Sequence, residues 1–385
     1  MSTMNKNTPT LNSPAFVGFY ESNHISPVSQ DISDMNKHYQ RRESLFRSLG
    51  ILPKLVKNSK FLEFGPGSGH NALYTASLFP ESYELVDGNL KGVRDTRTRL
   101  ETFGIDRITV HHALFSEYQS DARFDIVWAE GCLPHQTQPI PLLEHIASFV
   151  VEDGCICVSI NNGISYLSET IRRLFRDRFF QASGDVHEQA RKLTPYVQPH
   201  LQHLRGMSRP VEDWILDSIV QPMRDRRLLS IPEVVSCLDR EFDVYGSSPR
   251  FLTDWRWYKE IIGDDRRFNE LALDNYYKNN LNLLDYRFDF PEHSRAYGEK
   301  LEALGSRSWD LMCEIEHGNE LIWKEFFDLM DELCSHIDGE APITVGAIRE
   351  SCALLQNATP DMDLSQFPQW WGRGQQYLSL IRKKR

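Results

Sequence analysis

Segment 60–69 constrains the fold more than any other part of the chain. It is an apolar run that contains Glu63 and leads directly into three glycines at alternate positions. Residues 71–79 then have helical spacing and stop before Pro80. A buried strand, a glycine-rich turn and a helix start together predict a pocket in which the backbone passes close to a ligand. Glycine suits this turn because a Cβ would block the approach or forbid the turn dihedrals.

The spacing of the glycines separates two classes of pocket. The dinucleotide fingerprint G-x-G-x-x-G/A needs a small third residue so that the helix can pack on the strand. Counted from Gly65, that position is His70, which is too large. The order here is E-x-G-x-G-x-G, starting at Glu63.

Further strands are predicted in a regular order after this turn, over residues 83–87, 107–111, 123–131 and 150–160. Their apolar residues are continuous rather than alternating, which is typical of strands covered on both faces. The second strand ends in Asp87, and Gly88 and Asn89 supply the turn beyond it. A carboxylate at this place in a parallel sheet binds the ribose hydroxyls of an adenosine ligand.

Over residues 55–160 the five βα units, with their FDIV (124–127) and EDG (152–154) segments, resemble the class I S-adenosylmethionine-dependent methyltransferases. The resemblance implies an α/β fold with a seven-stranded Rossmann-like sheet. It also implies S-adenosyl-L-methionine as the cofactor.

The chain after residue 160 departs from the minimal pattern of that family. An insert over 161–229 is expected before the sixth strand, and we expect it to roof the substrate pocket. A packing or dimerisation role is the alternative for this insert. A delayed helix with Ser230 as its N-cap should follow, then a sixth strand over 241–246 and a seventh near 251–259.

We therefore divide the chain into residues 1–50, a cofactor-binding domain over 51–260 and a helical C-terminal region over 261–385. A helix over 31–49 should lie over the pocket, with Tyr39 and Arg42 as its most suggestive residues. The alternative is a surface helix without a catalytic contact. Four segments of the C-terminal region have helical spacing: 271–284, 294–316, 320–337 and 345–355. A lid, a dimer interface and a partner site remain open for them.

The resemblance assigns the cofactor contacts residue by residue. The expected residues are Glu63, Gly65, Pro66, Gly67, Ser68, Gly69, Asp87, Gly88, Asn89, Ala113, Leu114, Phe115, Glu130 and Gly131. Glu63 would face the methionine amino group or orient the loop, and a core acid is its alternative. Ala113, Leu114 and Phe115 would flank the adenine.

Three residues are candidates for catalysis if the acceptor is a hydroxyl that must lose its proton. His135 comes first because it lies in the loop after the fourth strand, Glu130 second and His203, in the insert, third. Asn161 or Asn162 would position the substrate. A structural hydrogen bond is the alternative for either histidine.

Composition limits the partners. The net charge of −11 argues against a nucleic-acid substrate, and no apolar run approaches the ~20 residues needed to cross a bilayer. Seven scattered cysteines indicate reduced thiols in the cytoplasm, and we expect no metal site. A homodimer through the C-terminal helices or the insert is a further expectation.

The function expected from all this is methyl transfer to an oxygen or nitrogen of a small molecule: a sugar, a glycoconjugate or a secondary metabolite. Two alternatives stay open. An aminopropyltransferase would tend to have paired aspartates after the fourth strand, where this chain has Glu130-Gly131-Cys132. A non-catalytic module would bind the cofactor or only a partner.

Overall fold

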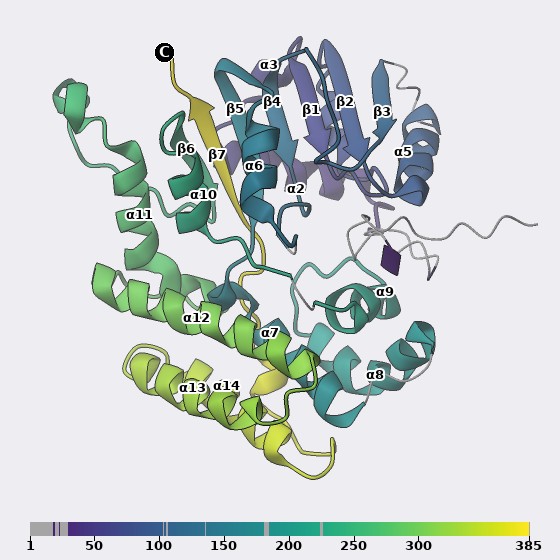
Figure 1. Ribbon diagram of the computed structural model, residues 1–385, viewed down its shortest axis with the longest axis vertical. Coiled ribbons are helices and arrows are strands. Elements are labelled where there is room, and N and C mark those ends of the chain that lie inside the picture. Colours follow the sequence, from purple (N-terminus) through teal and green to yellow (C-terminus); the bar gives the residue numbers. More distant parts are fainter. Residues whose placement is uncertain are drawn as a thin grey trace, which may run out of the picture.

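The computed structural model describes most of the chain and is shown in Figure 1. The described residues are 18–19, 23, 30–102, 104, 107–134, 136–180, 185–223 and 226–384. Their centre is a seven-stranded sheet in the order β3-β2-β1-β4-β5-β7-β6. The expected α/β architecture is therefore confirmed.

Five strands run parallel and form the part of the sheet that the sequence predicts best. They are β1 (Lys60–Phe64), β2 (Ser82–Asp87), β3 (Ile108–His112), β4 (Phe124–Ala129) and β5 (Val150–Ile160). The side chains of the inner strand β1 are buried on both faces: Leu62 and Phe64 pack on one side of the sheet, Phe61 on the other. This two-sided burial explains why the inner strands have continuous apolar sequences. In the edge strand β3 only Val110 is buried.

Helices cover the two faces of the sheet. One face packs against α2 (Met35–Ser48), α4 (Ala72–Ser77) and α5 (Leu90–Thr102). The other packs against α6 (Pro139–Ala147) and α10 (Ile231–Leu238). A short helix, α3 (Pro53–Val56), leads into β1. The N-cap of α10 is Ser230, as predicted, and it forms a capping box with Glu233.

The insert between β5 and α10 is helical. It contains α7 (Gly163–Phe179), α8 (Val186–Leu201), α9 (Val211–Ile215) and a single π-helical turn, Leu216–Val220. Its two ends meet in a β-bridge between Asn161 and Leu229. Figure 1 shows these helices gathered beyond the carboxyl ends of the parallel strands, where the insert was expected to stand.

A second helical segment follows β6 (Phe242–Ser248). Two 3-10 turns, Tyr258–Glu260 and Gly263–Asp265, come first, and then α11 (Phe268–Asn279) with a 3-10 turn (Asn280–Leu283), α12 (Arg295–Glu316), α13 (Ile322–Ile337), α14 (Pro342–Gln356) and the 3-10 turn Phe367–Gln369. The longest helix, α12, packs directly on α7. A Cβ at Gly163 would lie 2.0 Å from the carbonyl oxygen of Gly305, so the two backbones touch at glycines. The helical insert and the second helical segment are thus packed against each other through α7 and α12.

The seventh strand is not near residues 251–259, and this prediction was wrong. β7 is Gln376–Arg382, at the C-terminal end of the described chain, and it lies antiparallel between β5 and β6. The aromatic residues of that segment are exposed, since Trp255 is 94% and Trp257 57% accessible. The expected domain boundary after residue 260 also needs correction, because residues 376–382 belong to the sheet.

Candidate active site

The turn after β1 has the backbone geometry that requires glycine. Gly65, Gly67 and Gly69 have φ values of 77°, 58° and 79°. A Cβ on Gly65 would also lie 2.9 Å from the Cβ of Cys132. The turn therefore brings bare backbone to the carboxyl ends of β1 and β4.

Helix α5 holds this turn in place through two side chains. The Thr96 hydroxyl donates a hydrogen bond to the carbonyl oxygen of Gly67 at 2.9 Å. The Nε of Arg99 donates to the carbonyl oxygen of Ser68 at 2.8 Å. These contacts fix carbonyl groups of the turn and leave its geometry independent of any ligand.

Asp87 closes the turn from the end of β2. Its carboxylate accepts hydrogen bonds from the backbone N–H of Gly67 at 3.0 Å and of Asn89 at 2.8 Å. Burial raises the pKa of Asp87 to about 6, although both backbone N–H groups oppose this. Asp87, which is predicted to bind the ribose, is thus in direct contact with the predicted glycine turn.

Asn89 presents a polar group that nothing in the described chain satisfies. Its Oδ1 accepts from the backbone N–H of Gly92 at 2.9 Å, near the start of α5. Its Nδ2 is buried and has no hydrogen-bond partner among the described residues. Because a buried unpaired donor is costly, this amide is suited to a ligand atom in the adjoining cavity.

Glu130, at the exit of β4, collects donors from four elements. The Arg42 guanidinium of α2 binds it through two hydrogen bonds of 2.9 and 2.8 Å. Asn71, Trp128 and Tyr377 donate further hydrogen bonds at 3.2, 2.9 and 3.0 Å. Burial raises the pKa of Glu130, but the Arg42 charge and these donors outweigh it and lower the pKa below the ordinary value. Glu130 is therefore an ionised brace with little capacity left to accept a proton.

Glu63, for which a cofactor contact was expected, lies beneath the glycine turn in the protein interior. It is buried and accepts a hydrogen bond from the Tyr83 hydroxyl of β2. Burial raises its pKa to about 7 against the effect of that hydrogen bond. Glu63 is not among the described residues that line the cavity.

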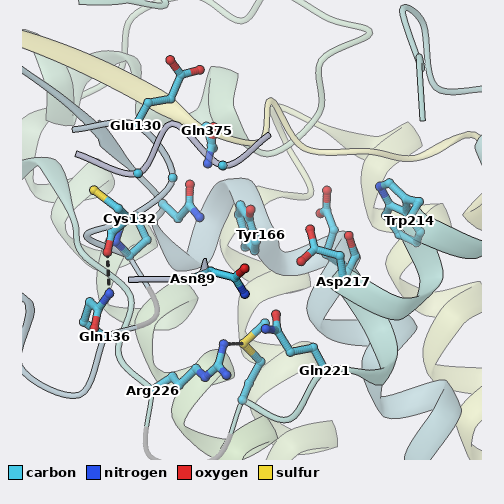
Figure 2. A pocket seen from close by; sticks show the side chains of 18 of the residues that line it. Asn89, Glu130, Cys132, Gln136, Tyr166, Trp214, Asp217, Gln221, Arg226 and Gln375 are labelled. Carbon is cyan, nitrogen blue, oxygen red and sulfur yellow. Dashed lines mark hydrogen bonds between the residues drawn. The ribbon is translucent and has the colours of Figure 1, made fainter. Parts of the chain in front are cut away.

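A cavity of about 380 Å³ joins the end of the sheet to the helical insert, and Figure 2 shows its interior. The sequence-predicted residues that line it are Gly65, Gly67, Asp87, Asn89, Phe115, Glu130 and Gly131, and the predicted positioning residue Asn161 joins them. The predicted residues Pro66, Ser68, Gly69, Gly88, Ala113 and Leu114 support the same turns without lining it.

The catalytic candidates have three different outcomes. Glu130 reaches the cavity. His203 does not line it: it lies exposed after α8, and its carbonyl oxygen accepts from the Tyr286 hydroxyl at 2.6 Å. His135 lies outside the described residues. Asn162 is the N-cap of α7, where its Oδ1 accepts from the backbone N–H of Ser165.

Sequence reasoning missed most of the cavity wall that the insert supplies. These residues are Tyr166, Glu169, Arg173, Arg209, Trp214, Asp217, Ser218, Gln221, Met223 and Arg226, with Trp309 and Gln375 from beyond the insert. The available signal was the spacing of Tyr166, Glu169 and Arg173, which places them on one face of α7.

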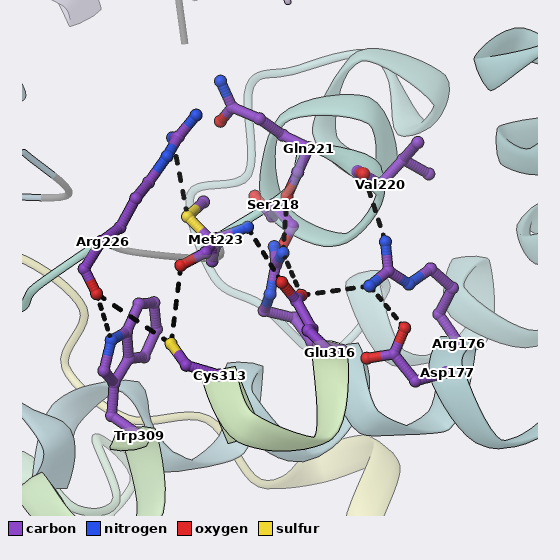
Figure 3. Close-up of polar contacts among 11 residues, drawn as sticks. Arg176, Asp177, Ser218, Val220, Gln221, Met223, Arg226, Trp309, Cys313 and Glu316 are labelled. Atoms are coloured by element: carbon purple, nitrogen blue, oxygen red, sulfur yellow. Dashed lines mark hydrogen bonds and ion pairs between the residues drawn. The ribbon is translucent and has the colours of Figure 1, made fainter. Parts of the chain in front are cut away.

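Figure 3 shows how the π-helical turn of this wall is fixed. Arg173 donates to the carbonyl oxygens of Ser218 at 2.7 Å and Gln221 at 2.5 Å. Glu316 of α12 pairs with Arg173 at 2.7 Å and with Arg176 at 3.0 Å. Its other oxygen accepts from the backbone N–H of Met223 at 3.0 Å. A helix from the second segment therefore positions the cavity wall of the first.

Comparison with known proteins agrees with this site. Residues 35–208 match the model of a protein family described as a methyltransferase domain. An uncharacterized protein of Rickettsia prowazekii (strain Madrid E) is 27% identical over 168 residues, which are 40% of this chain and 29% of that protein. The chain therefore spans less than a third of that relative.

Two solved structures are also similar. PKMT2 from Rickettsia typhi is 16% identical, with a TM-score of 0.42, over 62% of this chain and 49% of that one. The N-methyltransferase NodS from Bradyrhizobium japonicum, in complex with S-adenosyl-L-homocysteine, is 16% identical, with a TM-score of 0.31, over 38% of this chain and 74% of that one.

The family match covers residues 35–208, fewer than half of the chain, and describes this part as a methyltransferase domain. The cofactor expected for such a domain is S-adenosylmethionine. The residues present fit this cofactor. Gly65 and Gly67, both with positive φ, present bare backbone at the cavity, and Asp87 and the unpaired Asn89 amide supply an acceptor and a donor there.

Proposed function

We propose that this protein transfers the methyl group of S-adenosylmethionine to an oxygen or nitrogen atom of a small molecule. The continuous cavity carries the proposal. It joins the glycine turn and Asp87 at one end to the aromatic and polar wall of the insert at the other. A methyl donor and a methyl acceptor bound at its two ends would meet within one cavity.

The residues at the sheet would hold the cofactor. The Asp87 carboxylate would take the ribose hydroxyls, the Asn89 amide would donate to an acceptor atom of the nucleoside, and the backbone at Gly65 and Gly67 would face the rest of the molecule. When bound, S-adenosylmethionine supplies a methyl carbon whose bond to a positively charged sulfur breaks as the acceptor's lone pair forms the new bond. Proximity and alignment of the two reactants are then the main contribution of the protein.

A cytoplasmic location also belongs to this proposal. All seven cysteines are free thiols, which supports a cytoplasmic location. No helix in the described part of the chain has the length and apolar character needed to span a membrane. The homodimer expected through the helical segments is a separate proposal that sedimentation equilibrium would test.

The proposal is tested by incubating the protein with S-adenosylmethionine that carries a radiolabelled methyl group and a panel of small amines, phenols and sugars. We expect label in at least one acceptor product, and loss of that label in Asp87→Ala. No labelled product from a protein that still binds S-adenosyl-L-homocysteine would contradict methyl transfer and favour a binding module. Recovery of an aminopropylated acceptor in its place would favour the aminopropyl alternative.

A further inference from the structure

We propose that the insert end of the cavity recognises an amine, with the carboxylate of Glu169 as the group that binds the acceptor nitrogen. This inference rests on the proposed function and names the substrate class of the same site: a small amine with an aromatic or other apolar body and an oxygen atom within reach of Gln221. The amine is the atom that receives the methyl group.

Glu169 is a carboxylate at the cavity that makes no direct ion pair with any described residue. It lies on α7 and lines the cavity, and the Ser168 hydroxyl donates to it at 2.6 Å. None of the ion pairs among the described residues includes Glu169. The Arg172 guanidinium acts on Glu169 only through space, because its donors go to the ring of His200 and to the carbonyl oxygens of Ser168, Phe367 and Trp370. A buried carboxylate of this kind is suited to a cationic ligand.

Two of the cations that line the cavity are already occupied. Arg173 binds Glu316 and two backbone carbonyl groups. Arg209 pairs with Asp217 at 2.9 Å. The third, Arg226, lines the same cavity and donates to the sulfur atom of Met223 at 3.7 Å. An anionic acceptor bound at Arg226 is the competing outcome.

Gln221 is a second and independent sign of a ligand at this end. Its side chain is 4% exposed and lines the cavity, and its Nε2 has no hydrogen-bond partner among the described residues. Its backbone carbonyl is held by Arg173, so the residue is fixed in place. An oxygen atom of the acceptor would satisfy this donor.

The walls around these polar groups are aromatic. Tyr166 and Trp309 face each other edge to face with ring centroids 6.4 Å apart, and Trp214 lines the same cavity. Aromatic faces bury an apolar body and also attract a cationic nitrogen.

Glu169 can also accept the proton that the acceptor amine must lose. An ammonium nitrogen has no lone pair, so one N–H proton must leave before a new bond to carbon can form. That proton would pass to a carboxylate oxygen of Glu169. Burial raises the pKa of Glu169, although the Ser168 hydroxyl and the Arg172 charge oppose this, and a raised pKa makes it a better proton acceptor near neutral pH.

Three phenolic probes that differ only in their head groups test the inference: tyramine, tyrosol and 3-(4-hydroxyphenyl)propionate. Each is titrated calorimetrically into the full-length protein saturated with S-adenosyl-L-homocysteine. We expect tyramine to bind at least tenfold more tightly than the other two. We expect Glu169→Gln to weaken tyramine about tenfold while the affinity for S-adenosyl-L-homocysteine stays unchanged.

Glu188→Gln on α8 is the matched control, because this glutamate lies outside the cavity and pairs with Lys192 on the surface. The control should keep the wild-type preference. Tighter binding of the propionate, no binding of tyramine, or an unchanged preference in Glu169→Gln would each overturn the amine assignment. These results are distinct from failure of the proposed function, in which S-adenosyl-L-homocysteine itself would not bind.

Discussion

The three carboxyl groups at the carboxyl end of the sheet, Glu63, Asp87 and Glu130, have pKa values shifted in opposite directions. Glu130 is kept ionised by Arg42 and three further donors, whereas burial favours the neutral forms of Glu63 and Asp87. The difference follows from partners rather than depth, since all three are extensively buried. This arrangement keeps Glu130 negatively charged beside the cavity.

The Arg42–Glu130 pair should be costly to break. Arg42→Met leaves the Glu130 carboxylate buried without its cation, and we expect a loss of about 3 kcal/mol in the free energy of unfolding. Affinity for S-adenosyl-L-homocysteine should also fall, because Glu130 lines the cavity. Urea denaturation and calorimetry measure the two effects. Arg41→Met, the exposed neighbour on the same helix, should change neither; equal effects of both substitutions would contradict the account.

Glu63 should make stability depend on pH. Its pKa is about 7 in the folded protein and close to 4.5 in the unfolded chain. Its stabilising contribution is therefore complete below pH 4.5 and is lost as the pH rises through 7, because only the unfolded state ionises readily in this window. Relative to the wild type, Glu63→Gln should gain roughly 2 kcal/mol in the free energy of unfolding between pH 5 and pH 8.

Urea unfolding of both proteins at the two pH values measures this difference. Glu117→Gln, at an exposed site, should follow the wild type. If the Glu63→Gln difference is the same at pH 5 and pH 8, then the raised pKa is wrong.

Much of the cofactor end of the site could be predicted at the residue scale, because each of its residues lies in a short motif at the end of a predicted strand. Gly65, Gly67 and Asp87 follow directly from strand and turn signals. The acceptor end could not be predicted in this way. Glu169 and Gln221 meet across a cavity only after α7 and the π-helical turn have packed, and neither belongs to a short motif.

At the scale of elements, the π-helical turn Leu216–Val220 stands out because helices of this type occur frequently at functional sites. Its last carbonyl groups have no helical partners, and Arg173 and Arg176 bind those of Ser218, Val220 and Gln221. Glu316 neutralises both arginines from α12. The wall of the cavity thus depends on a helix that contributes Trp309 as its lining residue.

Loss of Glu316 should loosen that turn. Glu316→Gln leaves two buried arginines with one carboxylate fewer, and we expect a lower melting temperature and faster amide hydrogen exchange over residues 216–223. Exchange measured by mass spectrometry tests this directly. Glu314 lies on the same helix but is only partly buried and pairs with Arg307, so Glu314→Gln should leave the exchange unchanged. Unchanged exchange in Glu316→Gln would contradict the proposed clamp.

At the scale of the whole molecule, the last strand in the sequence, β7, lies inside the sheet rather than at its edge. β7 fills the gap between β5 and β6, so the helices α11 to α14 form an excursion between two neighbouring strands (Figure 1). Local patterns cannot reveal such a connection. The segment near Trp255 has strand-like aromatic residues, whereas the strand that closes the sheet is separated from β6 by the whole second helical segment.

Truncation tests this arrangement. Ending the chain after residue 375 removes β7 and leaves unpaired backbone groups along both β5 and β6, so we expect an insoluble or unfolded protein. Ending it after residue 382 removes only a tail with two surface ion pairs and should leave a folded protein. Soluble yield and circular dichroism distinguish the two. A folded, soluble product from the shorter chain would contradict the placement of β7.

The most direct test of the central claim is calorimetric titration of S-adenosyl-L-homocysteine into the purified protein. The glycine turn, Asp87 and Asn89 predict one site per chain, and Asp87→Ala should weaken it at least tenfold. Asp121→Ala, at an exposed position on the same domain, should bind like the wild type. No binding by the folded wild-type protein, or unchanged affinity in Asp87→Ala, would contradict the account.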